Sequence, residues 1–230
     1  MRSIMRYYKD WKKKRHLRSI PEDVKSPAFS VLVSDKKETP PKTTPKRSVK
    51  TTFDKTFKII MIGNSEVGKQ TLLKNHAKEV ISKPTLNEEL GIGFHTKSVI
   101  LEDKLYQLQI WRFKDFERFQ MFISSYGKGA IAGIFVFDIT RIHSLQNYEK
   151  WFSTLRHMIT NPNQFPVLLI GNKADLVDQR QVSSQQAINI AKANKLNGYV
   201  EVSAKTGENV EEAFKIITRL IVTYSTLLLS

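Results

Sequence analysis

The segment that most constrains the fold of this chain runs from residue 57 to residue 79. A short apolar run, residues 57–62, leads directly into the loop Gly63-Asn-Ser-Glu-Val-Gly68, and Lys69 then opens a stretch with helical spacing. Glycines let a backbone curl around a phosphate group, and the N–H groups at the start of the following helix favour negative charge. A strand, such a loop, a lysine and a helix in this order predict a phosphate-binding loop. An ordinary glycine-rich turn is the alternative, and the four features together disfavour it.

The rest of the sequence indicates what surrounds this loop. Short β-rich runs alternate with amphipathic stretches from residue 57 onward, which is typical of βαβ units around a mainly parallel sheet. The predicted strands cover residues 57–62, 94–101, 105–111, 132–138, 166–171 and 198–202, and the predicted helices 69–79, 117–128, 144–159, 183–194 and 209–224. The short polar turn at 102–104 predicts an antiparallel second and third strand, and Ser183 with Gln186 has capping-box form. The predicted fold class is α/β: a six-stranded, mainly parallel sheet with helices on both faces.

Two further segments indicate the base that the site selects. Asn172-Lys173-Ala174-Asp175-Leu176 follows one apolar strand, and Ser203-Ala204-Lys205 follows the last one. A carboxylate at Asp175 can accept two hydrogen bonds from the N1–H and amino group of guanine, a donor pair that adenine lacks. An ATPase is therefore the least favoured alternative. We expect Lys173 and Lys205 to pack against the base, Asn172 to tie its loop to the phosphate loop, and the Ala204 N–H to meet the guanine carbonyl oxygen.

The candidate nucleotide-binding residues all lie in these three segments. They are Gly63, Ser65, Glu66, Val67, Gly68, Lys69, Gln70, Thr71, Asn172, Lys173, Asp175, Leu176, Ser203, Ala204 and Lys205. Lys69 is expected to reach the β-phosphate, and the γ-phosphate of a triphosphate. The predicted ligand is GTP or GDP, no catalytic residue or metal ligand is assigned, and the sequence leaves the use of magnesium open.

In this order and spacing the motifs resemble those of the Ras-like small GTPases, most closely the Rab branch. The resemblance covers roughly residues 56–222. It includes Trp111 and Glu117-Arg118-Phe119, close to the family's W-D-T-A-G-Q-E-R-F, and continues through Ser124–Ala130, Phe137-Asp138-Ile139-Thr140 and Trp151. It implies the P-loop NTPase fold, binding of effector or regulatory proteins at the switch segments, and a role in membrane traffic or signalling.

The chain departs from the family pattern at the phosphate end of the site. Gln70 stands where the family has a magnesium-binding Ser or Thr, and Glu89 stands where it has a second such Thr. Arg112 replaces the Asp that holds magnesium through water, Asp115 replaces the Gly whose N–H meets the γ-phosphate, and Phe116 replaces the Gln that orients the attacking water. Phosphoryl transfer depends on positioning and on charge stabilisation by the metal. The sequence therefore predicts a pseudo-GTPase, in which guanine selection is kept and hydrolysis is weak or absent.

Two of the substituted side chains carry charge that bears on the phosphates. Glu66 replaces a P-loop glycine and, with Asp115, is expected to repel a γ-phosphate. We expect Arg112 to face solvent on a loop, and the alternative is a guanidinium that forks onto phosphate in place of the metal. Two competing hypotheses are an active GTPase, with a magnesium site rebuilt from Gln70 and residues such as Thr85, and a nucleotide-free interaction scaffold.

The net charge of +15 is concentrated in residues 1–52, which hold 15 Lys and Arg against 5 Asp and Glu. Residues 3–20 have Ile4, Tyr8 and Trp11 at helical spacing beside a basic cluster, so they either lie on an anionic membrane surface or form a solvated arm. Residues 21–50, rich in Pro, Thr, Ser and Lys, predict a disordered linker. The expected division is therefore a basic arm and linker, residues 1–52, and a guanine-nucleotide-binding domain, residues 53–230. A basic tail is weak support for nucleic-acid binding, which we do not expect.

The absence of cysteine excludes several kinds of site. With no cysteine in the sequence there is no disulfide, thiolate zinc site, cysteine nucleophile or cysteine-linked lipid. No apolar run approaches the roughly 20 residues that span a bilayer. We therefore expect a cytoplasmic protein, either free or held peripherally on an anionic membrane through residues 1–20.

Overall fold

A single mixed sheet forms the centre of the molecule. The computed structural model describes residues 30–32, 52–79, 91–114, 125–146, 148–158 and 165–227. Its sheet has eight strands in the order β1-β8-β7-β6-β2-β5-β4-β3. They are β1 (Ser30–Leu32), β2 (Lys55–Ile62), β3 (Lys78–Glu79), β4 (Ile92–Leu101), β5 (Lys104–Phe113), β6 (Ala132–Asp138), β7 (Val167–Asn172) and β8 (Gly198–Val202). Neighbours from β1 to β5 along this order pair in parallel, whereas β4 runs antiparallel to both β5 and β3.

All six predicted strands are present in this sheet, and its mainly parallel character is confirmed. The strands β6 and β8 have the predicted bounds, and the others differ only at their ends. Two short edge strands, β1 and β3, were not predicted. Residues 30–32, assigned from the sequence to a disordered linker, instead pair in parallel with residues 198–200 of β8. Residues 1–29 and 33–51 lie outside the described residues, so the basic arm and the boundary after residue 52 stay predictions.

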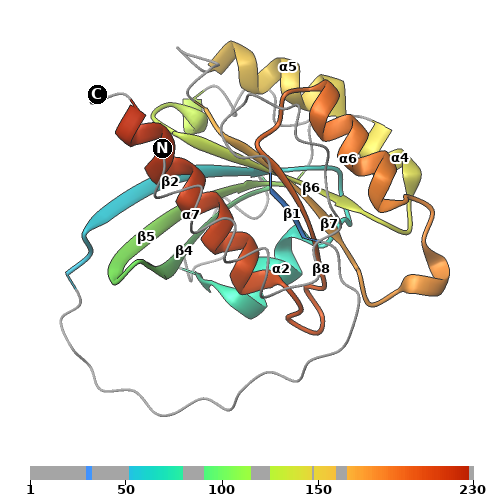
Figure 1. The fold of residues 1–230 in the computed structure, drawn as a ribbon, viewed down its shortest axis with the longest axis horizontal. Helices are drawn as coiled ribbons and strands as arrows, with labels where there is room; N and C mark the ends of the chain where they lie inside the picture. Colours follow the sequence, from blue (N-terminus) through green and yellow to red (C-terminus); the bar gives the residue numbers. More distant parts are fainter. Residues whose placement is uncertain are drawn as a thin grey trace.

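Helices cover both faces of the sheet, as expected. The α-helices are α2 (Lys69–His76), α4 (Ile142–Gln146), α5 (Tyr148–Met158), α6 (Ser184–Ala193) and α7 (Val210–Leu227). Figure 1 shows α2 and α7 on one face and α4, α5 and α6 on the other. The helix predicted over 144–159 is divided between α4 and α5, and the one predicted over 117–128 is described only at its end, where residues 125–127 are helical. Among the described residues, none of the helices is long and apolar enough to cross a membrane.

Local sequence signals explain two of the element boundaries. The β4–β5 hairpin turns at Glu102 and Asp103, whose φ angles of 51° and 60° are those of a two-residue type I′ turn. Helix α6 begins with a complete capping box, because Ser183 Oγ accepts from the Gln186 N–H at 3.2 Å while Gln186 Oε1 accepts from the Ser183 N–H at 2.8 Å. Both features were predicted from the sequence and are confirmed.

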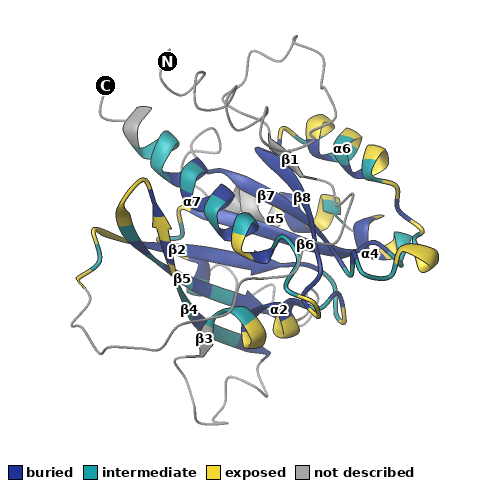
Figure 2. Ribbon diagram, turned by 60° about the horizontal axis from the view of Figure 1, so that its bottom comes forward, coloured by how far each residue is buried: buried dark blue, intermediate teal, exposed yellow. Residues whose placement is uncertain are grey.

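The apolar core lies in two layers, one on each face of the sheet. Along β2, Ile59 and Met61 face the layer under α2 and α7, whereas Ile60 and Ile62 face the layer under α4, α5 and α6. Figure 2 shows the central strands buried and the outward helix surfaces exposed. Because the parallel strands β2, β6, β7 and β8 run in the same direction, the loops that follow them meet at one edge of the sheet.

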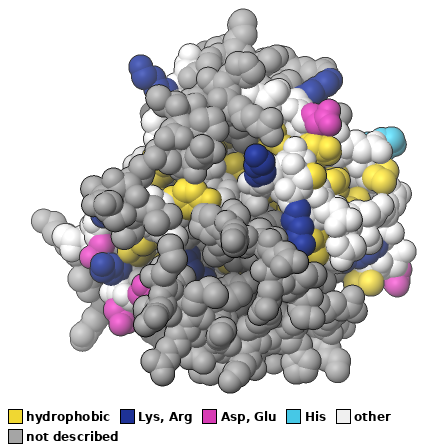
Figure 3. Space-filling model, turned by 45° about the horizontal axis from the view of Figure 1, so that its top comes forward, with side chains coloured by type: hydrophobic (Ala, Val, Ile, Leu, Met, Phe, Trp, Pro, Cys, Tyr) yellow, Lys and Arg dark blue, Asp and Glu magenta, His cyan; other side chains and the backbone are white. Residues whose placement is uncertain are grey.

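Charge is dispersed over the described surface. On the face in Figure 3, the coloured Lys and Arg side chains stand apart from one another, with Asp and Glu side chains among them. The basic excess of the chain belongs mainly to residues 1–52. The described part of this face therefore offers no continuous basic patch of the kind that binds nucleic acid.

Candidate nucleotide-binding site

The phosphate loop joins β2 to α2, and close contacts require both of its glycines. A Cβ on Gly63 would lie 2.1 Å from the carbonyl oxygen of Val136 in β6, and one on Gly68 would lie 2.2 Å from Asn172 Nδ2. Both glycines also have a positive φ, 138° and 92°, which side chains disfavour. The loop therefore has the tight curl that brings backbone N–H groups toward an anion.

Lys69 opens α2 and turns its ammonium group back into this loop. Lys69 Nζ donates to the carbonyl oxygens of Gly63 at 2.5 Å, Asn64 at 2.6 Å and Lys114 at 3.3 Å. The side chain is only 4% exposed, and Val67 beside it is fully buried. The ammonium group thus lies inside the loop, at the place where the sequence analysis expects the β-phosphate.

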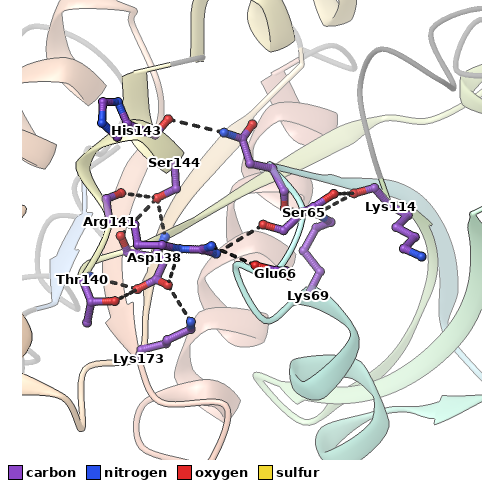
Figure 4. A network of polar contacts seen from close by, with 11 residues as sticks. Ser65, Glu66, Lys69, Lys114, Asp138, Thr140, Arg141, His143, Ser144 and Lys173 are labelled. Atoms are coloured by element: carbon purple, nitrogen blue, oxygen red, sulfur yellow. Dashed lines mark hydrogen bonds and ion pairs between the residues drawn. The ribbon is translucent and has the colours of Figure 1, made fainter.

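Glu66 keeps the backbone shape of the loop although it replaces a glycine of the family pattern. Its φ is 62°, in the left-handed region that glycine adopts freely. Its carboxylate accepts from Arg141 Nη1 at 3.1 Å, while Arg141 Nη2 donates to the Ser65 carbonyl at 3.3 Å (Figure 4). The Glu66 side chain is 81% exposed. Arg141 therefore holds the Glu66 carboxylate at the surface of the loop, and the expected repulsion of a γ-phosphate stays a prediction.

The remaining phosphate-loop candidates divide between the loop and the helix surface. Ser65 Oγ donates to the Lys114 carbonyl at 3.4 Å, so both Ser65 and Lys69 contact the residue that follows β5. Gln70 and Thr71 are exposed on α2. The structure therefore places Gln70 on the surface of the first helical turn and shows no enclosed oxygen ligand at this position.

Asn172, in the first base loop, contacts both the phosphate loop and the second base loop. The contact with the phosphate loop was predicted from the sequence and is confirmed. Asn172 Nδ2 donates to the Val67 carbonyl at 2.8 Å, and Asn172 Oδ1 accepts from the Ala204 N–H at 3.0 Å. The side chain is buried. The Ala204 N–H was expected to meet the guanine carbonyl oxygen, and here it instead donates to Asn172.

Ser203 of the second base loop holds Asp175 of the first base loop in a fixed position. Asp175 Oδ1 accepts from Ser203 Oγ at 2.6 Å, and the same hydroxyl accepts from the Thr206 N–H at 3.1 Å. Leu176 is half-buried, and its N–H donates to the Lys173 carbonyl at 2.9 Å. Lys205 is exposed. Ser203 uses only Oδ1 of Asp175, so Oδ2 stands on the loop where guanine is expected to bind.

Lys173 is held by an acidic residue to which the sequence analysis gave no role. Its Nζ lies 2.6 Å from Oδ2 of Asp138, which is fully buried at the end of β6 and also accepts from the Thr140 N–H and hydroxyl (Figure 4). Burial by itself raises the pKa of Asp138, but the hydrogen bonds from Lys173 and Thr140 and the charge of Lys173 bring this pKa below its usual range. Asp138 is thus a carboxylate at neutral pH and sets the direction of the Lys173 side chain.

A buried ion pair supports the loop that carries Ala204. Glu201, at the end of β8, is 0% exposed and accepts from Arg180 Nη1 at 2.9 Å, Arg180 Nη2 at 2.8 Å, the Tyr199 hydroxyl at 2.7 Å and Ser184 Oγ at 2.7 Å. Burial raises the pKa of Glu201, whereas these hydrogen bonds lower it, and the net direction is below the usual range. Sequence reasoning assigned Glu201 no role beyond its place in the strand predicted over 198–202, so this support was missed.

Asn75 is a further residue that the sequence analysis missed. It lies in the last turn of α2, and its Nδ2 donates to the Ala204 carbonyl at 3.1 Å. Ala204 is therefore held on both sides, by Asn172 through its N–H and by Asn75 through its carbonyl. No motif marks position 75, because the contact depends on how α2 lies against a loop 129 residues away.

The comparisons with known proteins agree with this geometry. Residues 58–223 match the description "Ras family". The chain belongs to the Ras family. Its relatives indicate the Rab branch: it is 36% identical over 169 residues to the GTP-binding protein ypt3 of Schizosaccharomyces pombe, covering 72% of this chain and 75% of the relative. It is also 37% identical over 171 residues to the Ras-related protein Rab-2B of Dictyostelium discoideum, covering 74% and 83%.

The magnesium positions of the Ras-family pattern hold unsuitable residues in this chain. Gln70 is exposed, and Arg112 is a cation. Arg112 was expected on a solvent-facing loop, which is wrong: it lies in β5 and is 7% exposed. Within the described residues there is no group of three or more His, Asp or Glu that could hold a metal ion, and residues 85, 89, 115 and 116 lie outside them. A cation at the position of the metal-holding Asp repels a metal ion, so the described residues do not fit magnesium.

Proposed function

We propose that this chain binds GDP or GTP in the site made by the phosphate loop and the two base loops. The observation that carries the proposal is the pair of hydrogen bonds from buried Asn172, at 2.8 Å to Val67 and 3.0 Å from Ala204. They join in one rigid unit the loop that would hold phosphate and both loops that would read the base. The printed name of the yeast relative states GTP binding for that protein, which supports the same function here.

Each loop has a separate role in this proposal. Lys69, whose ammonium group now contacts carbonyl oxygens, would exchange part of these contacts for β-phosphate oxygens. Asp175 would accept from the N1–H and amino group of guanine, while its hydrogen bond from Ser203 keeps the carboxylate in place. Lys173 and Lys205 would flank the base. The site would select guanine because a bound base covers this half-buried carboxylate, and leaving it covered without these two donors is costly.

We propose further that GTP hydrolysis by this chain is weak or absent. The structural support is Arg112, which stands buried where the family pattern has the metal-holding Asp, together with exposed Gln70 in place of the metal-binding hydroxyl. The substitution of Phe for the water-orienting Gln at position 116 acts in the same direction. Without a metal ion and an oriented water, a bound triphosphate loses the main sources of transition-state stabilisation.

The proposed setting is membrane traffic or signalling, through effector or regulatory proteins that bind next to the switch segments. A row of half-buried aromatic rings supports such a surface: Phe94 and Trp111 have ring centroids 4.8 Å apart, and Trp111 and Tyr126 have centroids 5.4 Å apart. Lys58 Nζ lies 5.2 Å from the Trp111 ring centroid. Half-buried aromatic side chains are enriched at protein interfaces.

The basic arm, residues 1–20, is proposed to attach the protein peripherally to anionic membranes. The support is its charge, since each Lys or Arg near an anionic leaflet contributes about 1 kcal/mol. The full chain should sediment with phosphatidylserine vesicles at low salt, whereas the protein without residues 1–20 should stay in the supernatant. Equal sedimentation of both proteins would remove this role from the arm.

Nucleotide binding by purified full-length protein tests the proposal. Nucleotide released by denaturation should be GDP or GTP. In competition with a fluorescent GDP analogue, GDP should bind at least about 100-fold more tightly than ADP, because ADP loses two hydrogen bonds to a charged group. The variant Asp175→Asn exchanges an acceptor for a donor, so it should lose GDP and gain the diphosphate of xanthine, which has a carbonyl oxygen in place of the guanine amino group. Asp178→Asn, in the adjacent exposed 3-10 turn Val177–Gln179, is the matched control and should leave the preference unchanged.

Each competing hypothesis predicts a different result. A nucleotide-free scaffold would release no nucleotide and bind no analogue, which would overturn the proposal. An active GTPase would bind guanine nucleotide but convert GTP to GDP in a reaction that stops with chelator, which would overturn only the statement about hydrolysis.

A further inference from the structure

Arg112 occupies a position that its neighbours fix closely. In β5 it pairs with Met61 of β2 on one side and with Gly93 of β4 on the other. Because side chains alternate along a strand, Arg112 shares the face of Leu108 and Ile110, which belong to the core layer under α2. Arg112 therefore lies on the face of the sheet that carries the phosphate-loop helix.

Gly93 makes room for the Arg112 side chain. A Cβ at Gly93 would lie 2.9 Å from Arg112 Nη2, 3.0 Å from Nε and 3.3 Å from Cζ, so the guanidinium lies flat against this glycine. Gly93 has no positive φ, so its backbone conformation does not require glycine. The glycine at 93 and the arginine at 112 are thus sterically matched, and a side chain at 93 would displace the guanidinium.

The end of β5 that carries Arg112 lies against the phosphate loop. Lys114, two residues after Arg112, accepts hydrogen bonds at its carbonyl from Ser65 Oγ and Lys69 Nζ. On the neighbouring strand, Met61 stands two residues before Gly63. Arg112 therefore stands in β5 next to the residues that reach the phosphate loop, and its side chain, like that of Lys69, is buried.

We infer that Arg112 supplies the positive charge for nucleotide phosphate that the family takes from magnesium, so that this chain holds GDP without a metal ion. This inference rests on the proposed guanine-nucleotide binding and deepens it. A guanidinium stays charged at every physiological pH and forms paired hydrogen bonds with phosphate oxygens. It has no acceptor atom, so it can neither take up a metal ion nor accept a proton from an attacking water, and it supports retention of the nucleotide and not its hydrolysis.

The experiment measures the dissociation constant of a fluorescent GDP analogue with full-length protein, in magnesium and in excess EDTA. For the wild type the two values should agree within about threefold, because no binding group depends on the metal. Arg112→Gln, which keeps a polar side chain and removes the charge, should weaken binding about tenfold or more in both buffers, the value of a hydrogen bond to a charged group. Arg112→Lys should recover part of this loss. Lys104→Gln, which removes an exposed cation from the other end of β5, is the matched control and should bind like wild type.

The outcomes separate this inference from the proposed function. Wild-type binding that falls more than tenfold in EDTA would overturn the inference and leave guanine-nucleotide binding intact, and this arm needs no variant to fold. Unchanged binding by a folded Arg112→Gln protein would also overturn it. Absence of GDP binding by the wild type in both buffers would overturn the proposed function itself.

Discussion

The buried ion pair between Arg180 and Glu201 gives the sharpest prediction about stability. Replacing Arg180 by Ala removes two of the four hydrogen bonds to the Glu201 carboxylate, at 2.9 and 2.8 Å, and leaves that carboxylate fully buried. Breaking a buried pair from one side costs about 3 to 5 kcal/mol, and the cost is smaller here because the Arg180 side chain is 24% exposed and water can reach the gap. We expect a loss of about 2 to 4 kcal/mol in the free energy of unfolding, which for a domain of this size lowers Tm by roughly 4 to 16 °C.

The same variant should change how stability depends on pH. In the wild type, the pKa of Glu201 is below its usual range, so its contribution to stability is present above the unfolded-state pKa and is lost as pH falls through the folded-state pKa. In Arg180→Ala, burial dominates and raises the pKa of Glu201, so protonation relieves part of the damage. The stability difference between the two proteins should therefore begin to narrow above the usual pKa of a glutamate, where the variant takes up its proton, and continue to narrow below that pKa, where the wild type does.

Urea unfolding followed by tryptophan fluorescence, at neutral and at mildly acidic pH, measures both effects. The double variant Arg180→Met with Glu201→Gln is the control, since it removes both charges and should lose less stability than Arg180→Ala alone. A loss below about 0.5 kcal/mol in Arg180→Ala, the range of an ordinary surface substitution, would refute the reasoning, as would a difference that stays constant with pH.

Three further substitutions test individual contacts of the site. Gly68→Ala places a Cβ 2.2 Å from Asn172 Nδ2 at a φ of 92°, so GDP affinity measured by fluorescence titration should fall about tenfold or more. Gly129→Ala, at an exposed glycine with open space around it, is the control and should leave the GDP affinity unchanged. Asn75→Ala removes one neutral hydrogen bond to the base loop and should speed release of GDP in stopped flow about 2- to 10-fold; an unchanged rate would mean that this contact does not position the loop. Glu66→Gly removes an exposed ion pair worth about 0 to 1 kcal/mol, so Tm should move by only a few degrees and GTP affinity by less than about threefold; a larger gain in GTP affinity would show that this carboxylate does act on the phosphates.

Much of the fold could be predicted because its local signals agree with one another. The short polar turn at 102–104 and the capping box at Ser183 depend on neighbouring residues, and both are confirmed. The edge strand β1 could not be predicted in this way, because its three residues, Ser30–Leu32, pair with β8, more than 160 residues further along the chain. A short apolar stretch among Pro, Thr and Lys gives no local sign of such a partner.

The site shows the same division between local and long-range information. The glycines and Lys69 follow from a contiguous motif, and so does the tie made by Asn172. The direction of the Glu66 side chain depends on Arg141, 75 residues away, and no local motif marks this partner. Arg112 was expected to face solvent on a loop, but it lies in β5, where the space left by Gly93 across the strand pair admits its side chain.

A single-turnover GTP hydrolysis assay tests the central claim most directly. Full-length protein in excess over radiolabelled GTP would be followed for released phosphate, with magnesium and with EDTA, after binding of GTP has been verified by filtration. Ras without an activating protein hydrolyses GTP at about 3 × 10⁻⁴ s⁻¹. We predict that this chain binds GTP and hydrolyses it at least about tenfold more slowly, at the same rate in both buffers. Hydrolysis at the intrinsic family rate that disappears with chelator would contradict the account.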